Sequence, residues 1–156
     1  MKFRFPLLLL LMAITAVSNA QNPLTTAIEA KAKAVLPKVI EWRRHLHQNP
    51  ELGNRETKTM AYIAAHLRSL GIEVQEKVAL TGVVGLLKGG KPGPVVALRA
   101  DMDGLPVAER VDVPFKSTVT AEYLGQTVPV MHACGHDSHV AILMGTAEVL
   151  AAMKKD

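Results

Sequence analysis

The sequence has little cysteine and few aromatic residues. Cys134 is the single cysteine among 156 residues, which excludes an intramolecular disulfide. In an exported protein such a thiol is inert, paired with another chain, or functional. Aromatic residues make up 4% of the chain, and the sequence has no basic stripe with interleaved aromatics. The low aromatic content and the lack of a basic stripe together exclude nucleic-acid binding.

The first twenty residues have the pattern of a secretory signal peptide. Lys2 and Arg4 form a basic start, residues 7–17 are almost all apolar, and residues 18–20 offer small side chains at the usual cleavage positions. The run is short for a bilayer span, and an N-terminal membrane anchor is the alternative. We therefore predict an exported protein, periplasmic or secreted. Without Lys2 and Arg4, 16 basic side chains remain against 14 acidic ones, a net charge of +2.

Apolar residues at helical spacing predict a helix over residues 24–48 that ends before Pro50. Pro37 either kinks this helix or begins a second helical piece. The basic residues near its end, including His45 and His47, complement the negative end of the helix dipole.

A second helix is expected from a cap at Asn54 to a stop at Gly71, with His66 on its surface. A third helix is expected after residue 136, capped by Asp137 or Ser138. Its predicted buried side comprises Val140, Leu143, Met144, Ala147, Leu150 and Ala151.

Three strands are expected between the second and third helices, at residues 72–78, 83–87 and 95–98. The last two are nearly all apolar, which is typical of strands buried on both faces. Residues 107–127 are mixed and polar, and we expect loops with one short edge strand. Helices before and after a run of strands predict a layered α/β domain.

The stretch from Met131 to His139 contains the side chains best suited to binding a metal. Cys134 and His136 are two residues apart, so both side chains leave an extended or turning backbone on the same side. A thiolate sulfur and an imidazole nitrogen suit a divalent metal of borderline softness. Asp137 next to them is first explained as a helix cap.

A second polar cluster follows the predicted strand 95–98. Asp101 and Asp103 are two residues apart at its carboxyl end, where open α/β sheets place their sites. Taken alone they are a solvated loop; taken with Cys134 and His136 they begin a one- or two-metal hydrolytic centre. One carboxylate is expected to orient the histidine rather than to touch the metal.

Three segments then resemble one family. They are Arg43-Arg44-x-Leu46-His47-x-x-Pro50-Glu51-Leu52 (the first motif, residues 43–52), Leu98-Arg99-Ala100-Asp101-Met102-Asp103-Gly104-Leu105-Pro106 (the second motif, 98–106) and Met131-His132-Ala133-Cys134-Gly135-His136-Asp137 (the third motif, 131–137). The combination resembles the metal-dependent amidohydrolases that include hippurate hydrolase and the indoleacetyl-amino-acid hydrolases. These belong to metallopeptidase family twenty, subfamily D, in the aminoacylase and carboxypeptidase-G clan.

The resemblance implies a three-layer α/β/α zinc-peptidase-like catalytic domain, of which residues 21–156 are the N-terminal part. It implies that Cys134 and His136 are metal ligands and that Asp103 is a catalytic residue beside them. Asp101 stands where other branches have a ligating histidine, and it is left out of the ligand set. Two divalent metals per full-length subunit are implied, with manganese, cobalt, nickel and zinc all open.

The resemblance also implies parts that these 156 residues lack: a Glu-Glu pair, two further histidines and an inserted dimerisation or lid domain. Two protein ligands are fewer than the three of an open catalytic zinc site, so we expect this chain alone to bind metal weakly and to be inactive. The full-length protein is expected to be a homo-oligomer that hydrolyses N-acyl amino acids or small peptides. The alternatives are a non-enzymatic exported α/β module with a redox-active or partner-binding thiol, and a short decoy subunit.

Overall fold

The computed structural model describes residues 22–155, so the predicted signal peptide at 1–20 lies outside the described residues. The elements in chain order are α2 (Pro23–Gln48), α3 (Thr57–Ser69), β1 (Glu73–Val78), β2 (Gly82–Leu86), β3 (Thr120–Tyr123), β4 (Gln126–Pro129) and α4 (His136–Ala152). The α/β fold class predicted from the sequence is confirmed. No helix within residues 22–155 combines the length and apolar character needed to cross a membrane.

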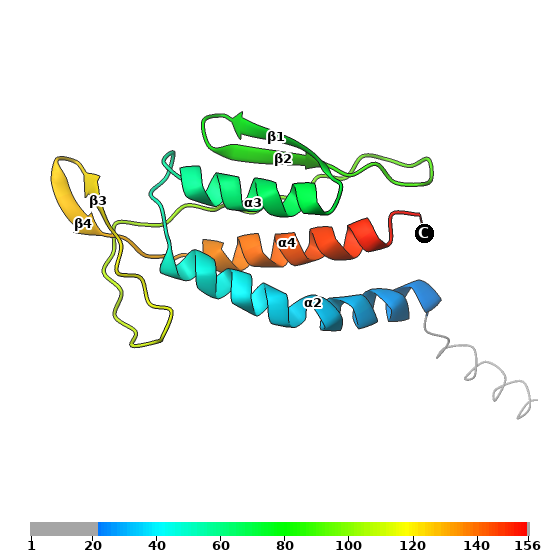
Figure 1. Ribbon diagram of the computed structural model, residues 1–156, viewed down its shortest axis with the longest axis horizontal. Helices are drawn as coiled ribbons and strands as arrows, with labels where there is room; N and C mark the ends of the chain where they lie inside the picture. The colour runs from blue at the N-terminus through cyan, green and yellow to red at the C-terminus, as the bar shows by residue number, and fades with distance from the viewer. Residues whose placement is uncertain (1–21, 156) are drawn as a thin grey trace, which may run out of the picture.

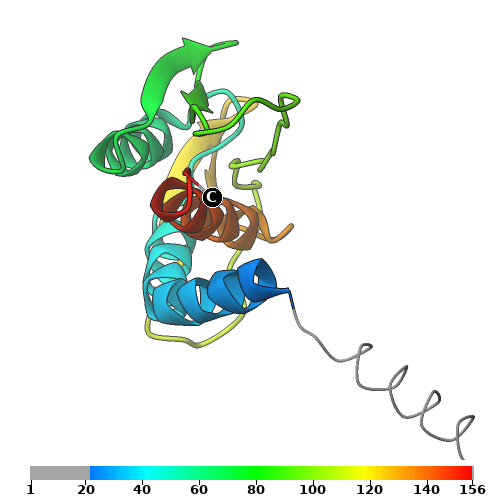
Figure 2. The same ribbon diagram turned by 90° about the vertical axis from the view of Figure 1, so that its right-hand side faces the viewer.

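The three helices of the described residues, α2, α3 and α4, form the body of this part of the chain. Figure 1 shows α4 lying between α2 and α3, with the β1–β2 hairpin over α3 and the β3–β4 hairpin at the opposite end from the C-terminus. In the view turned by 90°, α2 and α4 again lie side by side (Figure 2). The core sits between these two helices, where Leu46 of α2 packs with Val140, Ala141 and Met144 of α4. This packing brings the end of α2 to the start of α4.

The first helix matches its prediction within one residue. Asn22 caps α2 by accepting a hydrogen bond from the Leu24 N–H at 3.0 Å, and Pro23 occupies the first turn, where its missing N–H is harmless. The helix continues through Pro37, so the alternative in which this proline begins a separate helix was wrong.

The predicted caps of the two later helices were wrong. Asn54 lies before α3 with a φ of 63° and does not cap it. The carboxylate of Glu51 instead accepts from the Thr59 N–H at 2.8 Å and the Lys58 N–H at 3.2 Å. At α4 the cap position is held by Gly135, with a φ of 83° that favours glycine, and no side chain caps the helix.

Two details of the helix faces also differ from expectation. Leu150 was predicted on the buried side of α4, but 46% of its surface is exposed. His66 is not an ordinary surface residue, because its Nε2 lies 3.2 Å from the Met144 carbonyl oxygen and its ring packs edge-on against Trp42. His66 therefore links α3 to both other helices.

The strand predictions hold in part. Residues 72–78 and 83–87 correspond to β1 and β2, which pair antiparallel from Glu73↔Leu86 to Val78↔Gly82. Burial of β2 on both faces was wrong, because Val84 is 50% exposed. Residues 107–127 include β3, which pairs with β4 across a two-residue turn at Leu124-Gly125. Both turn residues have positive φ, as tight hairpins require.

The predicted strand at residues 95–98 was wrong. This segment has no strand partner among the described residues, and Val95 and Val96 are 93% and 76% exposed. Apolar β-branched residues favour a strand only where a neighbouring strand supplies hydrogen bonds and a packed surface. Here the chain runs extended past the helices without either.

Candidate metal centre

The three motifs meet through their backbones. Gly104 of the second motif donates its N–H to the Glu51 carbonyl oxygen at 2.6 Å and forms a parallel bridge with Leu52 of the first. The next residue, Leu105, exchanges two hydrogen bonds with Met131 of the third motif, at 2.8 and 3.1 Å. We call these five residues the motif joint. It gathers segments about eighty positions apart in the sequence.

Gly104 is required by this close approach. A Cβ at this position would lie 2.9 Å from Pro50 Cβ, 3.1 Å from Val130 Cγ1 and 3.2 Å from the Glu51 carbonyl oxygen. Pro50 and Val130 are fully buried beside the joint and Glu51 belongs to it, so these neighbours have little room to move. The glycine therefore sets how closely the second motif can lie against the first and the third.

Beyond the joint, Asp103 and His136 lie in direct contact. The Nδ1 atom of His136 is 2.8 Å from Asp103 Oδ1 and 3.1 Å from the Asp103 carbonyl oxygen. With Nδ1 bonded to the carboxylate, Nε2 is the ring nitrogen that could bind a metal. Cys134, two residues before His136, is exposed rather than packed among aliphatic side chains. From the sequence we expected one carboxylate to orient this histidine, and in the structure the carboxylate of Asp103 contacts its ring.

Asp101 does not join this contact. Its Oδ1 accepts hydrogen bonds from Arg99 Nη2 at 2.8 Å and Nε at 3.1 Å, at the surface. These hydrogen bonds, with the charge of Arg99 and more weakly of His136 and His139, hold the pKa of Asp101 below its usual range. The two aspartates predicted as a pair therefore have different partners.

The chemistry of Cys134 and His136 fits a divalent metal of borderline softness as part of a ligand set. One sulfur and one imidazole nitrogen are donors that zinc, cobalt and nickel accept. Among residues 22–155, no group of three or more Cys, His, Asp or Glu side chains converges closely enough to hold a metal ion. The described residues thus offer two candidate ligands, Cys134 and His136, and one carboxylate, Asp103, in contact with the histidine.

A buried ionic network adjoins the third motif. Asp137 is 1% exposed, and its Oδ2 accepts from Arg43 Nε at 2.8 Å and contacts His47 Nδ1 at 2.9 Å. The other ring nitrogen of His47 lies 2.8 Å from Glu109 Oε2. The explanation of Asp137 as a helix cap was therefore wrong, and the helix dipole alone does not account for His47. His45, by contrast, is exposed and stacks on Tyr62.

The network has a consequence for the ionisation of Glu109. Burial acts to raise its pKa, but hydrogen bonds from His47 and from the Val111 N–H outweigh burial and hold the pKa below its usual range. Sequence reasoning did not single out Glu109. A glutamate in a polar loop carries no local signal, because its partner lies 62 positions away.

The first histidine of the third motif is also buried. His132 is 5% exposed, and neither ring nitrogen has a hydrogen-bond partner in the described part of the chain. Burial lowers its pKa, and the nearby Asp137 carboxylate opposes this effect. The Asp103 backbone is close enough to favour the protonated ring but is not in hydrogen-bonding geometry. Within the third motif His132 is therefore buried, while Cys134 is exposed.

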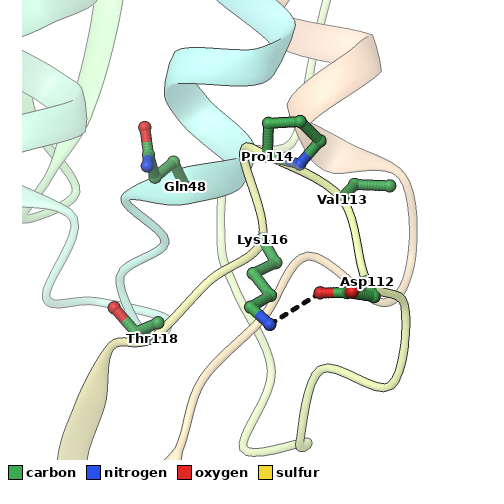
Figure 3. A pocket seen from close by; sticks show the side chains of 6 residues that line it. All are labelled: Gln48, Asp112, Val113, Pro114, Lys116 and Thr118. Carbon is green, nitrogen blue, oxygen red and sulfur yellow. Dashed lines mark hydrogen bonds and ion pairs between the residues drawn. The ribbon is translucent and has the colours of Figure 1, made fainter.

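Two surface hollows lie near the motifs. The larger, of about 510 Å³, is lined by Gln48 and the loop from Asp112 to Thr118, with Lys116 bonded to Asp112 across it at 2.8 Å (Figure 3). It contains none of the predicted ligands. The smaller, of about 270 Å³, lies between α2 and α4, where Arg43, Arg44 and Phe115 meet Ser138. Neither hollow is centred on Cys134 and His136.

An α/β fold with an exposed cysteine two positions before a carboxylate-bonded histidine is the arrangement expected of a metallohydrolase-like domain. Residues 97–156 match the family described as "Peptidase family M20/M25/M40". The thermostable carboxypeptidase 2 of Saccharolobus solfataricus is 54% identical over 117 residues, which are 74% of this chain and 28% of that protein. The N-acyl-L-amino acid amidohydrolase of Geobacillus stearothermophilus is 43% identical over 118 residues, 76% of this chain and 30% of that protein.

A solved structure gives the same result. The chain is similar to the Bacillus subtilis YXEP protein, described as a dinuclear metal binding peptidase from the M20 family, with a TM-score of 0.68 and 41% identity. The similarity covers 78% of this chain and 32% of that one. The resemblance to the M20 peptidase family that the three motifs predicted is confirmed by these matches. The chain spans just under a third of the length of the curated relatives it matches.

Proposed function

We propose that this chain is part of an exported, metal-dependent amidohydrolase that cleaves the amide bond of N-acyl amino acids or small peptides. Three findings support the proposal: the family, the amidohydrolase and carboxypeptidase names of its relatives, and the dinuclear metal site named for the similar solved structure. The observation that carries it is the 2.8 Å contact between Asp103 and His136, beside the exposed Cys134. The same findings favour a hydrolase over a redox-active module.

In this proposal Cys134 and His136 bind metal, and Asp103 acts beside them. The carboxylate of Asp103 holds the Nδ1 proton of His136, which fixes the ring tautomer and directs Nε2 to the metal side. A bound divalent metal would polarise the scissile carbonyl and activate water. Cys134, exposed two positions before His136, supplies the anionic sulfur.

Several finer points belong to the proposal. The full-length subunit would hold two divalent metals, chosen among manganese, cobalt, nickel and zinc, and would form a homo-oligomer. Residues 1–20 would direct export and be removed. Because the described residues offer two ligands, residues 21–156 alone would bind metal weakly and hydrolyse nothing, in line with the three protein ligands of open catalytic sites.

The test is hydrolysis by the full-length protein. It would be purified with manganese, cobalt or zinc and incubated with a panel of N-acyl amino acids, and the released amino acid would be measured. Cys134→Ser should remove most of the activity while leaving the fold intact, because it deletes one metal ligand. His45→Gln is the matched control and should retain activity, because His45 is an exposed histidine far along the chain from the turn that contains Cys134 and His136. Absence of amino acid release with every substrate and metal would contradict the proposal.

A further inference from the structure

The most deeply buried charge in the described chain sits next to the proposed metal ligand His136. Asp137 is 1% exposed, and a carboxylate removed from water is costly unless charged donors surround it. Arg43 Nε and His47 Nδ1 both meet its Oδ2, at 2.8 and 2.9 Å. Two basic residues therefore contact one acidic side chain, which does not cap its helix.

The two donors come from one face of α2. Arg43 and His47 are four residues apart, so they lie on the same face of the helix, about one turn apart, near its end. Asp137 is in the first turn of α4, and Figure 1 shows α2 running beside this helix. The ion pairs therefore tie the start of α4 to the end of α2. Glu109 holds His47 from its other side at 2.8 Å, which keeps the ring in one orientation.

The metal-binding turn lies between two fixed points. On one side Met131 is bonded to Leu105 in the motif joint, and on the other Asp137 is bonded to α2. Between them Gly135 adopts a φ of 83° and lets the chain turn sharply into α4. A turn of five residues anchored at both ends has few conformations left. The anchor at Asp137 acts on the backbone that carries both Cys134 and His136.

We propose that Asp137, held by Arg43 and His47, is a positioning residue that fixes the Cys134–His136 turn for metal binding. It acts through the start of α4 and does not touch the metal. The inference rests on the proposed function, since it takes Cys134 and His136 as ligands. It assigns a common purpose to Arg43 and His47 of the first motif and Asp137 of the third.

The test is a cobalt(II) titration of the full-length protein, followed by the sulfur-to-cobalt charge-transfer absorption. Asp137→Asn keeps the size of the side chain but removes its charge, and it should weaken cobalt binding about 10- to 100-fold, as loss of a residue that orients a ligand typically does. His47→Gln should weaken binding in the same direction, and it provides a second variant if Asp137→Asn does not fold. The absorption of the bound form should also change, because the turn no longer holds one geometry.

Two controls separate positioning from stability. Lys38→Gln removes another ion pair between α2 and α4, the exposed contact with Glu148, and should leave cobalt affinity unchanged. Met144→Ala lowers the stability of the same helix pair without touching the turn, and its folded fraction should bind cobalt normally. Circular dichroism of each metal-free variant reports its fold.

The outcomes are distinct. If the unsubstituted protein shows cobalt–thiolate absorption that Cys134→Ser removes, and Asp137→Asn and His47→Gln bind cobalt with unchanged affinity, the positioning role is wrong and the proposed function stands. Equal weakening in Lys38→Gln would also overturn the positioning role. If the unsubstituted protein shows no such absorption, the proposed function fails and the inference fails with it.

Discussion

Two regions of the molecule differ in which side chains they bury: one buries charged and polar side chains, and the other leaves apolar side chains exposed. In the region around the motif joint, charged and polar residues are buried, and Asp137 and His47 are 1% and 7% exposed. In the apolar stretch at residues 95–98, Val95 is 93% exposed and Leu98 is 55% exposed. Polarity alone would predict the reverse. Asp137 and His47 are stable in the interior because each has an ionisable partner within 2.9 Å, and the valines are exposed because no described residue packs over them.

The comparison shows what decides burial here. The motif region is closed by hydrogen bonds and ion pairs between segments, each of which needs a specific residue at a specific place. The apolar stretch depends on a surface that residues 22–155 do not provide. Four experiments test this difference, ordered from the largest expected effect to the smallest.

The largest effect should come from truncating the core beside the motifs. Met144 is 2% exposed between α2 and α4, so Met144→Ala should lower the free energy of unfolding by about 2–5 kcal/mol. Val96→Thr, at a position that is 76% exposed, should change it by less than about 0.5 kcal/mol. Urea unfolding of both variants measures the difference. Similar losses in the two would mean that the apolar stretch is packed in solution.

A smaller effect is expected from adding one methyl group to the motif joint. Gly104→Ala would place a Cβ 2.9 Å from Pro50 Cβ, and such overpacking costs about 1–3 kcal/mol. Gly93→Ala, before the apolar stretch, meets no atom within 4 Å and should be neutral. Thermal unfolding distinguishes them. A neutral Gly104→Ala would show that the joint is looser than the structure has it.

The cap of α3 should matter by about 0.5–2 kcal/mol, the usual range for a residue that bonds the first N–H groups of a helix. Glu51→Ala removes the acceptor of the Thr59 and Lys58 N–H groups. Asn54→Gly keeps a residue suited to the positive φ at that position and should change stability little. Denaturant midpoints compare the two, and a larger loss in Asn54→Gly would restore asparagine as the cap.

The smallest effect is a change in how stability depends on pH. The pKa of Glu109 is lowered in the folded protein, so its contribution is fully present above the unfolded value of about 4.3 and is lost as pH falls through the folded pKa. Glu109→Gln should therefore flatten the decline of the melting temperature below about pH 4.3. Glu29→Gln, an exposed glutamate on α2, serves as the reference. Parallel curves for both variants would exclude a special role for Glu109.

Features that depend on neighbouring residues were predictable from the sequence. The span of α2 follows from apolar spacing and from Pro50 after its end. The start of α4 near the end of the third motif was predictable from apolar spacing, although its predicted cap was wrong, and β1 and β2 were predictable from their apolar runs. The ligand pair was predictable because Cys134 and His136 are two residues apart, and their role stays a prediction.

Features that depend on distant contacts were not predictable. Asp137 looks like a helix cap in the sequence, because its true partners lie 90 and 94 positions away. The strand expected at residues 95–98 required a partner that no local pattern reveals. Asp101 and Asp103 look equivalent in the sequence, and only the structure separates the one bound to Arg99 from the one bound to His136.

The sequence by itself determined the helices, the first hairpin, the family and the pair of side chains best suited to a metal. Each of these follows from residues close together along the chain or from three ordered motifs. Only the tertiary structure decided which carboxylate orients His136 and which basic residues hold Asp137. The physical reason is that a buried carboxylate is stabilised by donors from segments distant in the sequence, which only the fold brings close to it. Here the packing of α2 against α4 places Arg43 and His47 beside Asp137.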